Sequence, residues 1–142
     1  MKLLKNAKIY DGTGSEPFVG DVLIKDDTIL KVGQDIQALE ADVQDVAGLS
    51  LAPGFIDAHS HNDWFAIKQQ PLPFFAPFIR QGITSFVTGN CGISAAGYDD
   101  NTPHKARIGA DLFNYTDTRA VGGSHQAYFD AVDGHMPCNL AA

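Results

Sequence analysis

The chain changes its pattern near Gly48, and this change limits the kinds of fold that it can adopt. The first fifty residues are short β-forming runs separated by turn residues, and no stretch of ten residues suits a helix. The pair Asp26-Asp27 predicts a tight hairpin connection. We therefore expect residues 1–52 to form a small, mostly antiparallel β module. Its strands are expected at residues 3–9, 22–25, 28–33 and 43–46, with one helical turn at residues 36–40.

The remaining residues, 53–142, alternate between strand-like and helix-like segments. Residues 49–56 are nearly all apolar around Pro53-Gly54, which predicts a buried strand entered through a sharp bend. Because strands alternate with helices, parallel β/α units are expected. Two more strands are expected at residues 83–88 and 136–142, and helices at residues 73–81, from Thr102-Pro103 onward, and from Ser124 to Gly134.

Two histidines follow the first of these expected strands, in the sequence Asp57-Ala58-His59-Ser60-His61. Residues two apart in a strand project from the same face, roughly 7 Å apart at about 3.3 Å per residue. His59 and His61 would then converge on one metal ion, and zinc accepts such nitrogens at about 2.0–2.1 Å. Asp57 shares their face and is predicted to support the ligands through hydrogen bonds. The alternative is a pair of solvated polar side chains at a strand end.

A cysteine between glycines follows the next expected strand, in Gly89-Asn90-Cys91-Gly92. Neighbouring parallel strands end on the same side of a sheet, so Cys91 is expected beside the histidines. A thiolate is a good ligand for zinc. Asn90 is assigned, with Asp57, to hydrogen bonds that hold the ligands. The alternative for Cys91 is a buried structural thiol, which is the commoner fate of a single cysteine.

Composition excludes several classes of protein. The net charge is −7 and the isoelectric point is about 4.9, which argues against nucleic-acid binding. No apolar run approaches the roughly 20 residues that span a bilayer, so no membrane segment is expected. Two cysteines are too few for a disulfide framework, and the N-terminus has no signal-peptide pattern. We therefore expect a cytoplasmic protein.

The segments GFIDAHSHND (54–63) and RQGITSFVTGNCGIS (80–94) resemble the amidohydrolase superfamily. The cysteine in GNCG makes the chain most similar to the N-acyl-D-amino-acid deacylases, or D-aminoacylases. This resemblance implies a (β/α)₈, or TIM, barrel preceded by a small β-sandwich module. It also implies that His59, His61 and Cys91 bind one or two Zn²⁺ ions. The implied reaction is hydrolysis of the amide of an N-acyl-D-amino acid by metal-activated water.

The chain holds only part of such a barrel. A complete barrel needs about 250 residues, and residues 53–142 suffice for about three strands. The aspartate that acts as general base in the family is expected beyond Ala142, so no catalytic or substrate-binding residue is assigned. We expect a truncated chain that is inactive alone. Its outer strands would have open edges, which predicts self-association unless a C-terminal chain completes the barrel.

Two other functions stay open at this point. The first is a cyclic amidase similar to dihydroorotases and hydantoinases, which share the paired histidines. Those relatives usually bridge their metals with a modified lysine, so the position of Cys91 disfavours them. The second is a non-catalytic remnant that binds one metal ion through His59, His61 and Cys91, since three ligands and a water complete a tetrahedral zinc site.

Overall fold

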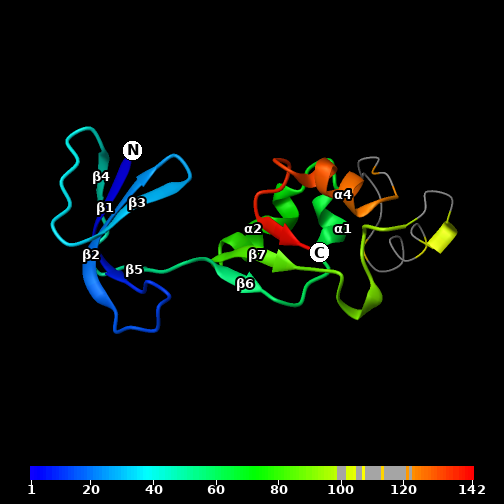
Figure 1. Ribbon diagram of the computed structural model, residues 1–142, viewed down its shortest axis with the longest axis horizontal. Helices are drawn as coiled ribbons and strands as arrows, with labels where there is room; N and C mark the ends of the chain where they lie inside the picture. Colours follow the sequence, from blue (N-terminus) through cyan, green and yellow to red (C-terminus); the bar gives the residue numbers. More distant parts are fainter. Residues whose placement is uncertain (99–101, 105–106, 108–112, 114–120, 122) are drawn as a thin grey trace. The chain divides into compact units, whose positions relative to one another are not determined.

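The computed structural model describes residues 1–98, 102–104, 107, 113, 121 and 123–142. Contacts divide the chain into two compact units, Met1–Pro53 and Gly54–Ala142, each with its own sheet (Figure 1). Most of the helix expected from Thr102 onward falls outside the described residues. Among the described residues, no helix has the length and apolar character needed to cross a membrane.

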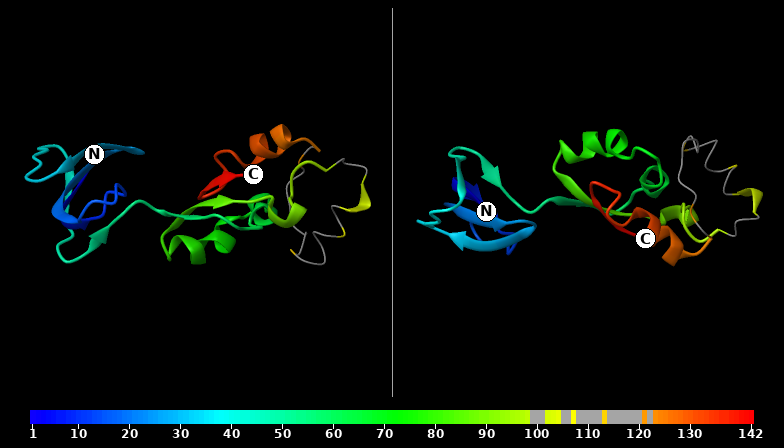
Figure 2. Two further views of the ribbon diagram at one scale, coloured as in Figure 1. Left: turned by 60° about the horizontal axis from the view of Figure 1, so that its bottom comes forward. Right: turned by 90° about the horizontal axis from the view of Figure 1, so that it is seen from above.

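The first unit is a single five-stranded sheet. The strands β1, β2 and β3 pair in antiparallel fashion, whereas β4 and β5 both run parallel to β1. The predicted hairpin is confirmed, and residues 1–53, all described, contain no helix (Figures 1 and 2). The strands are β1 Lys2–Ile9, β2 Phe18–Lys25, β3 Thr28–Gly33, β4 Asp42–Asp45 and β5 Ser50–Leu51.

One expectation for this unit differs from the structure. The helical turn expected at residues 36–40 does not form. The side chain of Ile36 is instead buried, and its backbone N–H donates a hydrogen bond to Oδ2 of Asp21 at 3.0 Å, a tertiary contact that local sequence does not reveal. The second layer of the sandwich implied by the resemblance is not shown by residues 1–53, which make one sheet.

A buried carboxylate, that of Asp21, organises the first unit. Its Oδ1 accepts a hydrogen bond from the backbone N–H of Asn6 at 3.0 Å. At this point the register of β1 against β2 shifts, and Asn6 has a φ of +63°. The Oδ2 atom of Asp21 accepts from the N–H of Ile36 and lies 3.7 Å from Nζ of Lys5. One side chain on β2 therefore satisfies backbone donors from two other segments.

Replacing Asp21 with alanine is expected to destabilise this unit by about 2–4 kcal/mol. The backbone N–H groups of Asn6 and Ile36 would lose their acceptor, and an unsatisfied buried donor costs about 1–3 kcal/mol. Chemical denaturation followed by circular dichroism measures the change. Asp27→Ala in the exposed turn between β2 and β3 is the matched control, with an expected change within about 0.5 kcal/mol. Equal changes for both variants would contradict a structural role for Asp21.

The second unit contains three parallel strands and the helices between them. The sheet order is β6-β7-β8. The mixed α/β pattern predicted from the sequence is therefore confirmed, whereas a closed barrel is not shown by the described residues. The elements are β6 Phe55–Asp57, α1 Asp63–Ala66, α2 Leu72–Ile79, β7 Ile83–Val87, the 3₁₀ turn η1 Asn90–Gly92, α4 His125–Val132 and β8 Asn139–Ala141.

The core of this unit lies between the sheet and its helices (Figure 1). Phe86 of β7 meets Phe75 and Phe78 of α2 edge to face, with ring centroids 5.5 and 5.4 Å apart. Trp64 of α1 and Tyr128 of α4 are fully buried in the same cluster. All three helices thus contribute buried side chains to one cluster with Phe86, and α1 among them begins two residues after His61.

The apolar run at residues 49–56 does not form one buried strand. Its first part is in β5 and its second in β6, where Phe55 and Ile56 are 63% and 67% exposed. The division falls at Pro53-Gly54, where a β-carbon on Gly54 would collide with the side chain of Thr84. β6 pairs with β7 alone among the described strands, which leaves its other edge uncovered.

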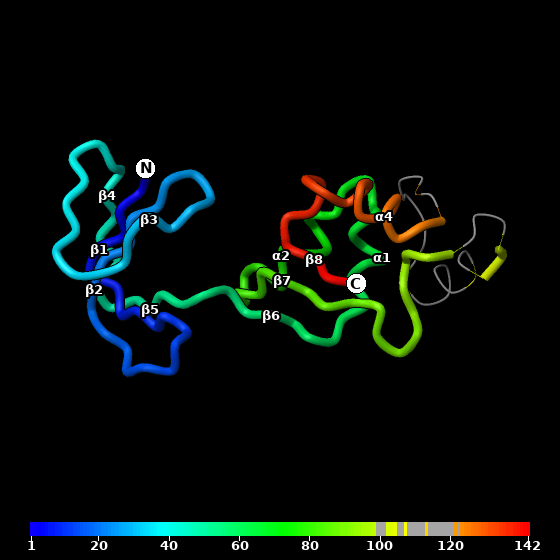
Figure 3. Tube along the Cα trace, in the orientation of Figure 1, coloured from blue at the N-terminus to red at the C-terminus, as the bar shows by residue number. Residues whose placement is uncertain are grey.

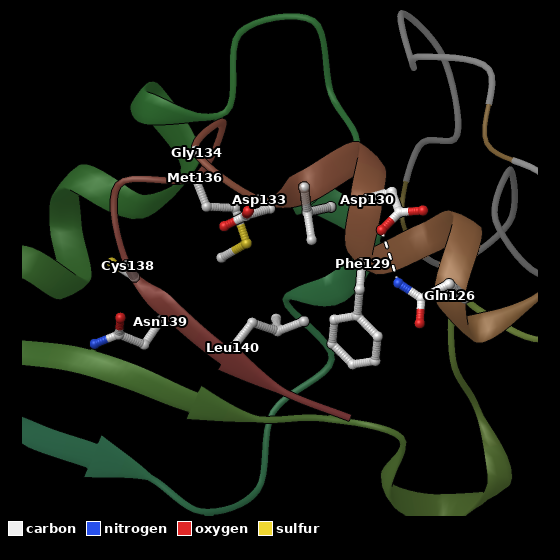
Figure 4. A pocket seen from close by; sticks show the side chains of 10 residues that line it. Gln126, Phe129, Asp130, Asp133, Gly134, Met136, Cys138, Asn139 and Leu140 are labelled. Atoms are coloured by element: carbon white, nitrogen blue, oxygen red, sulfur yellow. Dashed lines mark hydrogen bonds between the residues drawn. The ribbon is translucent and has the colours of Figure 1, made fainter.

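A pocket of about 480 Å³ lies between α4 and β8 (Figure 4). Phe129, Met136 and Leu140 supply much of its apolar lining, and Asp130 and Asp133 lie at the same pocket. None of the predicted site residues lines it.

Candidate metal centre

The two histidines lie just beyond β6 and not within it. β6 ends at Asp57, and the chain bends at residues 58–59 before α1 begins at Asp63. Strand periodicity therefore does not explain why the rings meet. They nevertheless lie together, with centroids 5.8 Å apart and planes at 79°. The turn that follows the strand brings His59 and His61 to one place.

Cys91 lies in the corresponding position after β7. It is an exposed residue of η1 with φ of +59°, a conformation unusual for a residue other than glycine, and Gly89 before it has φ of +76°. In this tight turn the thiol lies near the histidines that follow β6. The Sγ atom lies 3.5 Å from Nε2 of His59. One ligand atom from each of His59, His61 and Cys91 can be chosen so that all three lie within 4.8 Å of one another.

Asn90 links the two loops that carry these side chains. Its Nδ2 donates to the carbonyl of Val87 at 3.0 Å and to the carbonyl of Ser60 at 3.4 Å. The N–H of Ser60, the residue between the histidines, also donates to the carbonyl of Val87 at 2.9 Å. The histidine loop is thereby fixed to the end of β7, where the chain turns into the segment of residues 88–98 (Figure 3).

Asp57 makes a local contact in the same region. Its Oδ1 accepts a hydrogen bond from the backbone N–H of His59 at 3.2 Å. The carboxylate therefore holds the bend after β6 through the main chain of His59. Asp57 lies outside the compact group of three ligand atoms.

Sequence reasoning missed Asp63, a fully buried residue at the start of α1. Its Oδ2 accepts from the N–H of Ala95 at 2.6 Å and from the hydroxyl of Ser94 at 3.1 Å. Burial raises the pKa of this carboxyl, and these hydrogen bonds oppose the increase. The signal in the sequence is an acidic residue two positions after His61, where it falls in the first turn of a helix.

The donor set fits zinc. Two imidazole nitrogens and one thiolate are ligands that zinc prefers, and three protein ligands leave one position of a tetrahedron open. The Nδ1 atom of His61 is buried and has no hydrogen-bond partner among the described residues. Within the described part of the chain, this is the one group of at least three His, Cys, Asp or Glu side chains placed closely enough to share an ion.

Cys138, the second cysteine, is not in this group of three side chains and lines the α4–β8 pocket. It is half-buried, and burial raises the pKa of its thiol. It therefore serves as an internal reference thiol for Cys91.

Two imidazoles and a thiol that follow adjacent parallel strands form a group able to share a metal ion. No family model matches the sequence. The curated N-acyl-D-glutamate deacylase of Alcaligenes xylosoxydans xylosoxydans is 39% identical over 142 residues, which cover 99% of this chain and 27% of that protein. The N-acyl-D-aspartate deacylase of the same organism is 40% identical over 94 residues, covering 66% of this chain and 18% of that protein.

A solved structure agrees with these matches. The N-acyl-D-glutamate deacylase of Bordetella bronchiseptica, solved with zinc and a phosphonate mimic of the tetrahedral intermediate, is 33% identical with a TM-score of 0.75. The match covers 99% of this chain and 28% of that one. The chain is thus a homologue of the N-acyl-D-amino-acid deacylases of the amidohydrolase superfamily. It spans about a quarter of the length of the relatives that match it throughout.

Proposed function

We propose that this chain supplies metal ligands to a zinc-dependent amidohydrolase that hydrolyses the amide of N-acyl-D-amino acids. The observation that carries the proposal is the approach of His59, His61 and Cys91, whose ligand atoms lie within 4.8 Å of one another. These residues come from two loops that follow adjacent parallel strands. Homology to deacylases over the whole chain supplies the substrate class.

Within this proposal, the chain's own residues prepare the centre. His59, His61 and Cys91 would hold one or two zinc ions, and a bound ion supplies a Lewis acid for attack by water on the amide carbonyl. Asn90 holds the two loops together through the carbonyls of Ser60 and Val87. No residue of this chain is assigned as the general base or as a contact of the substrate carboxylate.

Zinc is expected to protect Cys91 from alkylation, which tests the proposed ligand set directly. The exposed thiol of Cys91 should react readily with iodoacetamide in metal-free protein and slowly after zinc is added. Peptide mapping by mass spectrometry gives the rate at each cysteine. Cys138, outside the site, is the internal control and should react at the same rate with and without zinc. Equal protection of both thiols, or of neither, would refute the assignment of Cys91.

A hydrolysis assay tests the expected inactivity of the isolated chain, and any activity would report on the substrate class. The zinc-loaded 142-residue chain is expected to release no D-amino acid from N-acyl-D-glutamate or N-acyl-D-aspartate, because it carries no assigned general base. Measurable zinc-dependent release would overturn the expectation of inactivity and support the substrate class. Zinc-dependent opening of a cyclic amide, with no action on either linear substrate, would favour the cyclic amidase instead.

A further inference from the structure

The segments that carry the proposed ligands are joined a second time, away from Asn90. Asp63 lies two residues after His61, and its side chain is fully buried. Its Oδ2 accepts hydrogen bonds from Ser94 and Ala95, which follow Cys91 by three and four residues. One carboxylate oxygen therefore connects the helix after the histidines with the segment after the cysteine.

The contacts around Asp63 fix its position on both sides. The hydroxyl of Ser94 also accepts from the N–H of Ala96 at 3.1 Å, which shapes the segment into a tight turn. The hydroxyl of Tyr128 on α4 donates to the backbone carbonyl of Asp63 at 2.9 Å. The Tyr128 contact holds the main chain of α1, whereas the Oδ2 contacts hold the segment that follows Cys91. These two contacts can be removed independently.

We propose that Asp63 is a positioning residue of the metal centre, which sets where the Cys91 thiol lies relative to His59 and His61. The reasoning rests on the proposed function, since it presumes that these three side chains bind metal. Cys91 has a positive φ and is exposed, so its own packing does little to fix it. The turn around Cys91 is held before it by Asn90 and after it by the hydrogen bonds to Asp63.

Cobalt(II) binding separates this role from a merely structural one, because thiolate ligation to cobalt produces a charge-transfer absorption band. Asp63→Ala is expected to weaken cobalt binding by about 10–100-fold, as for other groups that orient ligands, and to reduce the band per bound ion. Asp63→Asn should restore most of both signals, since an amide oxygen can accept from the N–H of Ala95. Tyr128→Phe is the matched control: it should lower thermal stability and leave the cobalt spectrum and affinity unchanged.

The outcomes distinguish the two proposals. A wild-type chain that binds no cobalt, or binds it without the thiolate band, contradicts the proposed function itself. A normal wild-type spectrum that Asp63→Ala leaves unchanged overturns the role of Asp63, and so does an equal loss in Tyr128→Phe. If Asp63→Ala does not fold, Ser94→Ala removes one donor to Oδ2, and we expect about threefold weaker cobalt binding from the loss of that hydrogen bond.

Discussion

Replacing Cys91 with alanine is expected to weaken zinc binding by more than about 100-fold. Loss of a group that only hydrogen-bonds to a metal ligand costs up to about 100-fold, and loss of a ligand should cost more. Cys91 carries the one thiol grouped with His59 and His61 among the described residues, with Sγ 3.5 Å from Nε2 of His59. Without it, two imidazoles remain, and two protein ligands are fewer than the three or four of ordinary zinc sites. Isothermal titration with zinc measures the change in affinity.

Cys138→Ala is the matched control for this variant, because it removes the other thiol and leaves the ligand group intact. Its zinc affinity is expected to equal that of the unmodified chain. If Cys91→Ala bound zinc as tightly as the control does, the deacylase-like centre would be wrong. The lysine-bridged arrangement of the cyclic amidases would then gain support, since it does not require this thiol.

Replacing Trp64 with alanine is expected to destabilise the second unit by about 3–5 kcal/mol, as is usual for a buried large aromatic residue. The side chain has no exposed surface, and its ring stacks on Phe113 with centroids 5.2 Å apart and planes at 5°. Since Trp64 lies in α1, the helix that follows the histidines, the metal centre should be lost with the packing. Denaturation with urea, followed by circular dichroism, measures the stability.

Phe55→Ala provides the control for this large effect. Phe55 is also aromatic, but it is 63% exposed on β6, so its replacement should change the free energy of unfolding by less than about 1 kcal/mol. Hydrogen exchange of residues 1–53 should be the same in both variants if the first unit folds on its own core of Ala7, Ile9 and Val22. A loss of protection there in Trp64→Ala would contradict independent folding.

Local sequence patterns account for much of the fold. The hairpin of β2 and β3, the α2 and α4 helices, and β7 were predicted, because hydrophobic periodicity and turn residues act within a few positions. Ser124, for example, was expected at the start of a helix, and its hydroxyl accepts from the N–H of Ala127 at 3.1 Å. The same local patterns predicted that the histidines and Cys91 follow the ends of two strands.

The sequence by itself determined which side chains are available to bind a metal: two histidines and a cysteine after neighbouring strands. The tertiary structure decided that they meet, because β6 and β7 pair in parallel and Asn90 joins their loops. It also decided the exposure of Phe55, an edge position, and the role of Asp63, whose partners lie 31 and 32 residues away. Such contacts depend on which distant segments pack together. Periodicity along the chain carries no information about which segments these are.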